Sequence, residues 1–266
     1  MNRLDKRFAD LRSKNQRAFV AYVCAGDPSL EKTREIVLTL EACGVDIMEL
    51  GLPFSDPLAD GIVNQMAADR ALRGGTTTAQ VLAFIENLRH ETDIPIVLFT
   101  YLNPVYTYGF EAFHRDAAAA GVDGVLILDL PPDEAAQNQE LLGHSSLKPI
   151  RLIAPTTPEE RIRLIAAQAE GFIYYVSREG VTGAQTTLSS SISSMVAAIR
   201  AATSTPVCVG FGISSPEQAK AVATMADGVV VGSAIVKLIE QHGHSPNLAE
   251  TLCGFVKPLV DAVKQA

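Results

Sequence analysis

The sequence predicts an α/β fold, a (β/α)8 TIM barrel with additional N- and C-terminal helices. Eight short apolar runs recur along the 266 residues, and amphipathic segments with helical spacing lie between them. Strands that alternate with helices form a parallel sheet, and runs that are apolar on both faces are typical of strands covered by helices. A chain of about 250 residues is also the usual size of such a barrel. The predicted strands are residues 19–24, 45–50, 94–99, 124–128, 149–153, 172–176, 206–209 and 228–231.

Helical spacing places amphipathic segments between these runs, and one further helix flanks each end of the barrel. No linker or low-complexity tract divides the chain, so we expect a single barrel domain over residues 1–266. An open doubly wound sheet would give the same periodicity and is the alternative. The predicted helices include residues 4–13, 31–42, 79–89, 110–120, 158–169, 192–202, 216–225 and 249–265.

Composition excludes several classes of protein. A net charge of -8 and a pI near 5.2 argue against nucleic-acid binding, which needs basic patches. No apolar run approaches the roughly 18 residues of a membrane span, and residues 1–7 are charged without the apolar segment of a secretory signal. We therefore expect no contact with a membrane.

Cysteine and histidine spacing gives no sign of a covalent framework or a metal centre. The four cysteines are scattered and form no CxxC pair, so a disulfide framework is not expected and a reducing, cytoplasmic location fits best. The five histidines fall in predicted helices or at their ends, away from the functional rim, and we expect no metal site. They are His90, His114, His144, His242 and His244.

Two carboxylates mark the end of the second predicted strand. Glu49 closes this strand, and the following segment, rich in proline and glycine, brings back Asp60. Two such groups can form an acid/base pair if their surroundings give them different pKa values. A helix cap, an ion-pair partner or a solvated loop residue is the alternative interpretation of either acid.

The same rim of the predicted barrel collects further polar side chains. Functional groups of such barrels lie at the C-terminal ends of the strands. Tyr101 follows the third run, Asp129 follows the fourth, and Tyr174 lies near the end of the sixth. These positions were not used to predict the strands, so their clustering supports a functional rim.

Glycine-rich loops after the last two runs predict a phosphate site. Gly212 and Gly232 allow the backbone to approach an anion, and Ser233 can donate through its hydroxyl and cap the next helix. Tight strand-to-helix turns are the alternative explanation. Neither loop has the pattern of a nucleotide-binding motif.

A long segment, 177–194, follows the sixth run and is predicted to be a loop that closes over the site. Gly180 and Gly183 could act as hinges, and Thr182 could hydrogen-bond an active-site carboxylate on closing. The alternative is a surface loop with no function.

Five segments together resemble the tryptophan synthase alpha subunit family over essentially the whole chain. They are residues 26–28, 49–61, 177–183, 210–213 and 232–236, of which the second is a signature of that family. The resemblance implies retro-aldol cleavage of indole-3-glycerol phosphate to indole and glyceraldehyde 3-phosphate. No lysine stands at a strand end ready to form an imine, which fits a retro-aldol reaction run by acid and base groups alone.

The resemblance also implies roles for individual residues. Glu49 would be the general acid/base, with a pKa raised by its apolar surroundings, and Asp60 would accept the indole N–H. Tyr174 would help to position the substrate, and Thr182 would close over Asp60. Walls against the indole would come from Tyr22, Phe99, Tyr101, Ile127, Ile153 and Phe211, and phosphate contacts from Gly183, Gly212, Gly232 and Ser233. Ordinary barrel core is an equal alternative for Ile127 and Ile153.

The sequence departs from the family pattern at the rim. Ile62-Val63-Asn64 replaces the usual proline, hydrophobic residue and isoleucine, and Tyr22 replaces a common phenylalanine. Both changes leave the two acids intact. The change at residues 62–64 affects the expected conformation of the loop after the second strand and its partner contacts. The change at Tyr22 adds a hydroxyl near the indole wall.

The family implies a separate beta subunit in an α2β2 complex, with pyridoxal phosphate bound only by that partner and no cofactor in this chain. The loop 53–60, with Asp56, is the expected partner surface. Three alternatives remain at this point: a stand-alone indole-3-glycerol-phosphate lyase, a mainly regulatory subunit, and another phosphate-binding barrel such as a sugar-phosphate isomerase. The last would not explain the apolar walls.

Overall fold

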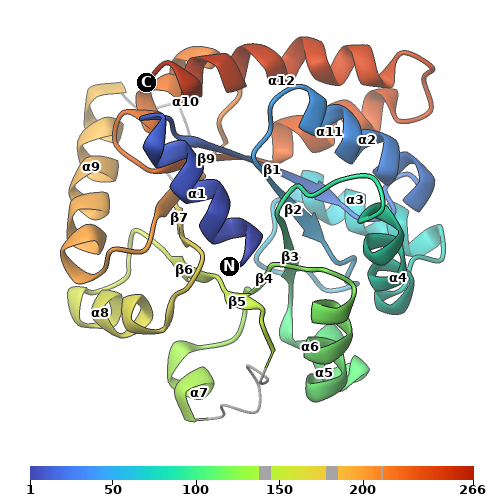
Figure 1. Cartoon of the computed structure of the whole chain (residues 1–266), viewed down its shortest axis with the longest axis horizontal. Coiled ribbons are helices and arrows are strands. Elements are labelled where there is room, and N and C mark those ends of the chain that lie inside the picture. The colour runs from blue at the N-terminus through green and yellow to red at the C-terminus, as the bar shows by residue number, and fades with distance from the viewer. Residues whose placement is uncertain (138–144, 178–184, 211) are drawn as a thin grey trace.

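A ring of parallel strands surrounded by helices forms the molecule, in a computed structural model that describes residues 1–137, 145–177, 185–210 and 212–266 (Figure 1). The described strands are β1 (Ala18–Cys24), β2 (Ile47–Gly51), β3 (Ile96–Thr100), β4 (Gly124–Ile127), β5 (Lys148–Pro149), β6 (Arg151–Ile153), β7 (Ile173–Val176), β8 (Val207–Gly210) and β9 (Gly228–Val231). Their order around the sheet is β5-β4-β3-β2-β1-β9-β8-β7-β6. The TIM barrel prediction is confirmed, and the open-sheet alternative is wrong.

The fifth predicted run, 149–153, forms two short strands rather than one. Only Ile150 separates β5, which pairs with β4, from β6, which pairs with β7. The ring therefore closes through the chain itself at this point, and the two ends of the sheet are contiguous in sequence.

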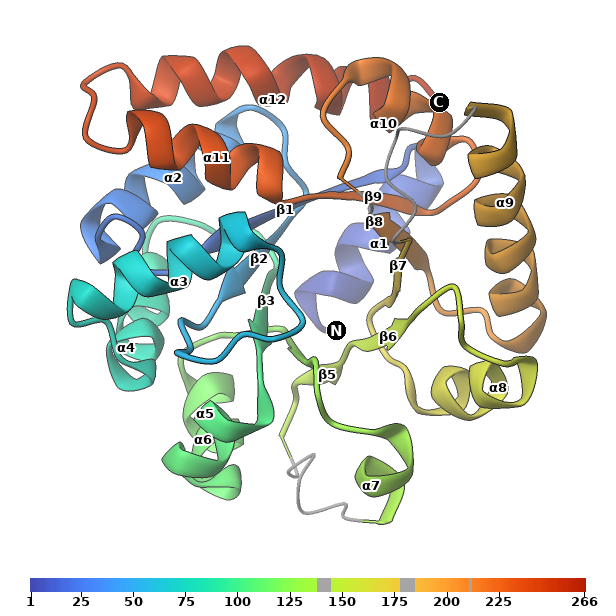
Figure 2. The same cartoon turned by 180° about the vertical axis from the view of Figure 1, so that it is seen from behind.

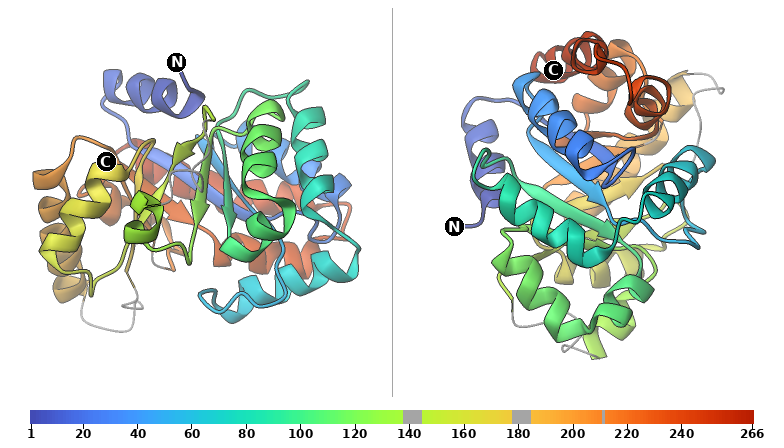
Figure 3. Two further views of the ribbon diagram at one scale, coloured as in Figure 1. Left: turned by 90° about the horizontal axis from the view of Figure 1, so that it is seen from below. Right: turned by 90° about the vertical axis from the view of Figure 1, so that its right-hand side faces the viewer.

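Helices cover the outside of the ring and one of its ends. The described helices are α1 (Arg3–Ser13), α2 (Leu30–Ala42), α3 (Ile62–Arg73), α4 (Thr78–Leu88), α5 (Leu102–Tyr108), α6 (Phe110–Ala119), α7 (Pro132–Gln137), α8 (Glu159–Gln168), α9 (Gln185–Ala202), α10 (Pro216–Ala223), α11 (Ser233–His242) and α12 (Leu248–Lys264). Helix α1 lies across one end of the barrel, and α3 lies at the opposite end (Figures 1, 2 and 3). In the described ranges, none of these helices is both long and apolar enough to cross a bilayer.

Strand alternation divides the core into two layers. Successive residues of a strand point to opposite faces, so β1 sends Phe19 and Ala21 toward the helices and Val20 and Tyr22 into the barrel. The outer cluster fills the space between the sheet and its helices. The inner cluster fills the barrel below the site and includes residues of α1, such as Leu4. This division decides which residue of each strand reaches the site.

Aspartates fix the strands at the N-terminal edge of the barrel. Asp46 precedes β2 and accepts the N–H of Phe19 at 2.7 Å, and Asp123 precedes β4 and accepts the N–H of Ile96 at 2.9 Å. Lys264 of α12 also contacts the Asp46 carboxylate. The buried strand N–H groups are thereby satisfied at the end away from the site.

Two expectations about the chain path were wrong or incomplete. Residues 185–194 were expected within a loop, but α9 already begins at Gln185. The serine- and threonine-rich composition suggested a loop, whereas the apolar spacing from Ile192 onward continues a helix that starts earlier. Helix α3 was not identified from the sequence, because its buried face is made of alanines at Ala67, Ala68 and Ala71.

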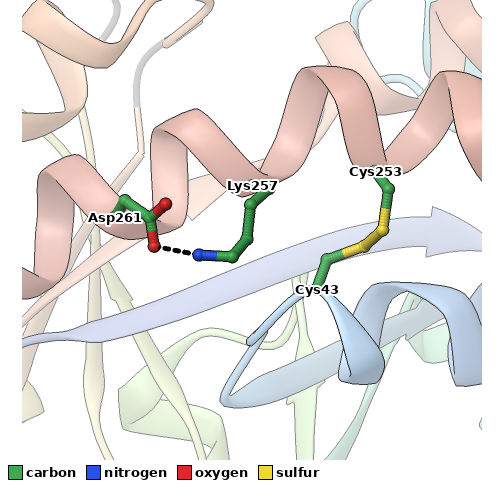
Figure 4. The surroundings of a disulfide bond; sticks show 4 residues. All are labelled: Cys43, Cys253, Lys257 and Asp261. Atoms are coloured by element: carbon green, nitrogen blue, oxygen red, sulfur yellow. Dashed lines mark hydrogen bonds and ion pairs between the residues drawn. A yellow bond between two sulfur atoms is a disulfide. The ribbon is translucent and has the colours of Figure 1, made fainter.

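The expectation of no disulfide was wrong for one pair. Cys43, just after α2, and Cys253, within α12, form a disulfide with their Cα atoms 5.7 Å apart (Figure 4). The two residues are 210 positions apart in the chain, and only the packing of α2 against α12 brings them together. Cysteine spacing therefore gives no valid argument for a reducing compartment. Cys24 and Cys208 are free and buried.

Candidate active site

A cavity of about 890 Å³ lies at the C-terminal ends of the strands, where the barrel fold predicts function. Every inward-facing strand end that borders it contributes a side chain or a glycine. The residues that line it include Tyr22, Glu49, Asp60, Asn64, Phe99, Leu128, Leu152, Tyr174, Gly210, Gly212, Gly232 and Ser233.

Glu49 is held inside the barrel by the alternation of β2. Its neighbours Met48 and Leu50 belong to the outer core, so the Glu49 side chain points inward. The residue is fully buried, and neither carboxyl oxygen has a hydrogen-bond partner within the described part of the chain. Burial disfavours the charged form and raises the pKa of Glu49 to about 8. The group is therefore mostly protonated at neutral pH.

Asp60 lies on the loop between β2 and α3 and accepts hydrogen bonds from neighbouring side chains. The Tyr101 hydroxyl donates to Asp60 Oδ2 at 3.0 Å, and it accepts the backbone N–H of Ala59 at 3.1 Å. The Gln65 side chain donates to the Asp60 main-chain carbonyl at 2.8 Å. Tyr101 thus holds the carboxylate from the end of β3, and Gln65 holds the main chain of Asp60 from the first turn of α3.

The pKa of Asp60 reflects opposing effects. Burial raises this pKa above its usual value, whereas hydrogen bonds from the Tyr101 and Asn64 side chains lower it. The result is a raised pKa, with burial as the largest cause. Donors of this kind stabilise the ionised form, and Glu49 has none in the described structure.

Aromatic rings form part of the cavity wall. Tyr22 and Phe99 pack edge to face with ring centroids 5.0 Å apart. Tyr174 faces the cavity, while Tyr175 is buried in the outer core, as alternation along β7 predicts. The structure therefore brings these three predicted wall residues to one space with the two acids.

Ile127 and Ile153 do not line this cavity, and their assignment as indole walls was wrong. Both belong to the outer layer, where Ile153 is fully buried and Ile127 packs against the outer core. Leu128 and Leu152 stand at the neighbouring inward positions and line the cavity instead. Parallel neighbours in register share a face, so Leu152 could have been found as the partner of Tyr174.

Two glycines and the beginning of α11 form the opposite side of the cavity. Gly212 has a φ of +69°, a left-handed conformation that favours glycine, and no described residue other than its chain neighbours has an atom within 4 Å of where its Cβ would be. Gly232 precedes α11, and Ser233 is the first residue of that helix. Ser233 does not cap α11 with its side chain, contrary to expectation, because Gly232 occupies the N-cap position. Gly232 and Ser233 line the cavity, so the N-terminus of α11, where the first N–H groups of a helix lack helical partners, lies at it.

Three predicted site residues, Thr182, Gly183 and Phe211, lie outside the described residues, as does the proposed hinge Gly180. The described residues contain no cluster of three or more side chains suited to a metal ion. No lysine occurs among the described residues that line the cavity.

The family model and the curated relatives named below all belong to one family. Residues 8–263 match the family model described as Tryptophan synthase alpha chain. A tryptophan synthase alpha chain of Geobacter sp. (strain M21) is 48% identical over 263 residues, covering 99% of this chain and 98% of the relative. One from Desulfatibacillum aliphaticivorans is 50% identical over 264 residues, covering 99% and 100%.

Solved structures agree with the sequence relatives. Tryptophan synthase subunit alpha from Legionella pneumophila str. Paris superposes with a TM-score of 0.91 at 34% identity, covering 100% of both chains. A structure of tryptophan synthase from M. tuberculosis, an open form with BRD0059 bound, gives a TM-score of 0.86 at 33% identity, covering 99% of each chain.

Proposed function

The chain belongs to the tryptophan synthase alpha chain family, and on that premise we propose that its cavity cleaves indole-3-glycerol phosphate to indole and glyceraldehyde 3-phosphate. The observation that carries the proposal is the pair formed by Glu49, which is buried without a hydrogen-bond partner among the described residues and has a raised pKa, and Asp60, which is held by hydrogen-bond donors. The reaction needs one proton donor and one stable anion, and these two environments supply them.

Glu49 acts first as an acid and then as a base. Its carboxyl proton is transferred to C3 of the indole ring, which becomes an electrophilic indolenine-like cation. The resulting carboxylate takes the proton of the side-chain hydroxyl next to C3 while the carbon–carbon bond breaks. That hydroxyl carbon becomes the aldehyde carbon, the bonding electrons return to the ring, and Glu49 is protonated again. A pKa of about 8 suits both steps, because the group gives and regains a proton near neutrality.

Asp60 stabilises the positive charge that develops on the ring. Its carboxylate accepts the indole N–H, and this hydrogen bond strengthens as the ring becomes cationic. Tyr101 and Asn64 favour the ionised form that this role requires. Tyr22, Phe99 and Tyr174 hold the ring between apolar surfaces.

The phosphate of the substrate binds at the other side of the cavity. Gly212 leaves its backbone open to a ligand, and Gly232 and Ser233 present the N-terminus of α11. A helix N-terminus with free N–H groups stabilises a phosphate without a basic side chain. We also assign Thr182, Gly183 and Phe211 to the site on the family resemblance.

We propose a separate beta subunit as partner, in an α2β2 complex. Apolar side chains stand exposed on the rim near Asp60, where Leu58 is 90%, Ile62 69% and Met66 45% accessible. Exposed apolar groups of this kind mark interaction surfaces. Because the cleavage uses only acid and base groups, we propose no cofactor in this chain, with pyridoxal phosphate held by the partner. On the family membership alone, we also propose that the protein acts in the cytoplasm.

Indole release from indole-3-glycerol phosphate by the purified chain, with and without a matching beta subunit, tests the function. Slow release that rises by orders of magnitude with the partner is the expected result. Fast release that the partner does not change would make the chain a stand-alone lyase. No release under either condition would overturn the proposed cleavage and favour a regulatory subunit or another substrate.

A further inference from the structure

A second cavity lies in the side of the barrel, between β4 and β6. β4 pairs with β5 only at Gly124 and Val125, and β6 pairs with β7, so no pairing of the described strands joins β4 to β6. A cavity of about 260 Å³ occupies this seam, and the segment 128–132 and α8 line its other sides. Helices α7 and α8 lie next to each other outside this part of the sheet (Figures 1 and 2). We call this space the seam cavity.

Arg151 of β6 brings a buried guanidinium to the seam cavity. Its neighbours Ile150 and Leu152 belong to the inner core, so Arg151 points outward from the barrel, as Ile153 does. Arg151 is only 7% exposed, and its Nε and Nη2 atoms are enclosed without a hydrogen-bond partner among the described residues. Nη1 is not one of these enclosed atoms, and Arg151 lines the seam cavity. Nη1 is therefore the atom through which the guanidinium can meet a ligand there.

The charge of Arg151 has no counter-charge within the described ranges. Asp129, which lines the seam cavity, accepts the N–H of Leu102 at 2.6 Å, and Asp133 of α7 pairs with Arg161 of α8 at 3.1 Å. Burial lowers the pKa of Arg151, and no described carboxylate offsets this effect. An arginine nevertheless stays charged in a protein, and a buried charge without a partner is strongly destabilising. An anion bound in the seam cavity would supply the missing charge.

The seam cavity is otherwise mainly apolar and small. Its volume equals that of roughly nine waters at ~30 Å³ each in the liquid, which is room for one ring or one branched chain. A few polar groups on a mostly apolar wall are the usual composition of a ligand site, where they orient an apolar ligand. The apolar lining residues include Ile127, Leu130, Pro131, Ile150 and Ile165.

We propose that the seam cavity binds a small organic acid, whose carboxylate pairs with Arg151 and whose compact apolar body packs against the isoleucines. The carboxylate accepts a charge-assisted hydrogen bond from Nη1, and it neutralises a charge that is delocalised over the whole guanidinium. The site is distinct from the cleavage site, because the substrate proposed above carries a phosphate and no carboxylate. The two cavities share only part of a wall, at Leu128, Leu152 and Ala154.

Benzoate is the probe for this site, and benzyl alcohol is its uncharged counterpart with the same ring. Calorimetry on the native chain is expected to give a dissociation constant for benzoate about tenfold or more below that for benzyl alcohol, since the hydrogen bond to benzoate joins two charged groups. Arg151→Met keeps the length of the side chain and removes its charge. It should weaken benzoate binding by about 10- to 100-fold and leave benzyl alcohol binding nearly unchanged.

Arg163→Met is the matched control, because Arg163 is an exposed arginine of α8 that pairs with Glu159 and does not line the seam cavity. It should bind benzoate as the native chain does. Arg151→Gln removes the same charge with a polar side chain, and it replaces Arg151→Met if circular dichroism shows that the methionine variant is unfolded.

Equal affinity of the native chain for benzoate and benzyl alcohol would overturn the inference, and so would the absence of benzoate binding at millimolar concentration. Benzoate binding that survives the loss of the Arg151 charge would place the ligand elsewhere and would also overturn it. Benzoate should likewise raise the Tm of the native chain and not that of Arg151→Met, because a ligand stabilises only the state that binds it. None of these measurements uses indole release, so this inference and the proposed cleavage can fail separately.

Discussion

Glu49 and Asp60 carry the same functional group, yet the fold places them in opposite surroundings. Glu49 lies on β2, fully buried, and its two carboxyl oxygens have no hydrogen-bond partner among the described residues. Asp60 lies on a loop at the rim, with Tyr101 on its carboxylate and Gln65 on its main chain. A carboxyl without donors keeps its proton, and a carboxylate with donors gives it up more easily. Burial raises the pKa of both carboxyls, and the hydrogen-bond donors that the described structure places only around Asp60 therefore distinguish the anion from the acid.

Glu49→Gln should have the largest effect of the substitutions at the acid pair. The substitution keeps the shape of the side chain and removes the transferable proton, so indole release should fall by about 10³- to 10⁴-fold. Binding of a phosphate ligand should remain, because the phosphate loops are untouched. Steady-state kinetics with Glu86→Gln, an exposed acid on α4, as the matched control measures the effect. Cleavage that survives in Glu49→Gln would contradict the assigned mechanism.

The pH dependence of the free energy of unfolding of the same variant should also reveal the burial of Glu49. The folded-state pKa of about 8 lies above the unfolded value, so the native state holds a proton that the unfolded state has lost between about pH 4.5 and 8. Native stability therefore falls as pH rises through this window. Glu49→Gln lacks this dependence, and its stability relative to the native chain should grow by on the order of 5 kcal/mol across the window.

Urea unfolding at pH 4.5, 6, 7 and 8.5 measures this difference. A constant offset between the two proteins comes from the amide itself and carries no information about the proton. A difference that does not change with pH would mean that Glu49 is already ionised in the native state, and the acid role would fail.

Asp60→Asn tests the other half of the comparison. An amide cannot stabilise the ring cation as a carboxylate does, so kcat should fall by about 10²- to 10³-fold, less than for Glu49→Gln. The basic limb of the pH profile, set by Glu49 near pH 8, should stay in place. Stopped assays from pH 5 to 9.5 give both numbers. A lost or displaced basic limb would show that the two acids titrate as one unit rather than in separate roles.

The sequence predicted the barrel and the two acids because their signals are local. Apolar runs and helical spacing give the order of strands, and a strand end followed by a proline-rich turn locates Glu49. Ile127 and Ile153 were wrongly predicted to line the site, because the strands were assigned without deciding which alternate residues face the interior of the barrel. A shift of one residue sends a side chain to the other face, so the correct residues, Leu128 and Leu152, were missed by one position each.

Contacts between residues far apart in the chain could not be predicted from the sequence, for a different reason. Cys43 and Cys253 meet because two helices far apart in the chain pack together, and no spacing rule encodes that contact. The environment of the acids was equally hidden. Tyr101 was expected to form part of the wall against the indole, whereas its hydroxyl donates a hydrogen bond to the Asp60 carboxylate. Donor geometry of this kind depends on loop conformation, which composition does not determine.

Tyr101→Phe gives the smallest and most selective change. It removes one donor from Asp60, so the pKa of that carboxyl should rise further, since the Tyr101 hydrogen bond lowers it. Asp60 must be ionised to stabilise the cation, and activity is lost as pH falls through its pKa. The acidic limb of kcat/KM should therefore move to higher pH, with a loss of about three- to tenfold at neutral pH. The basic limb, which belongs to Glu49, should not move.

This pattern separates an electrostatic role of Tyr101 from a simple packing role. A packing defect would lower kcat/KM at every pH and leave the acidic limb where it is. Tyr108→Phe, on α5, supplies the control for loss of a tyrosine hydroxyl outside the cavity. An acidic limb that stays in place in Tyr101→Phe would mean that the donors around Asp60 do not set its charge. The contrast with Glu49 would then have to come from burial alone.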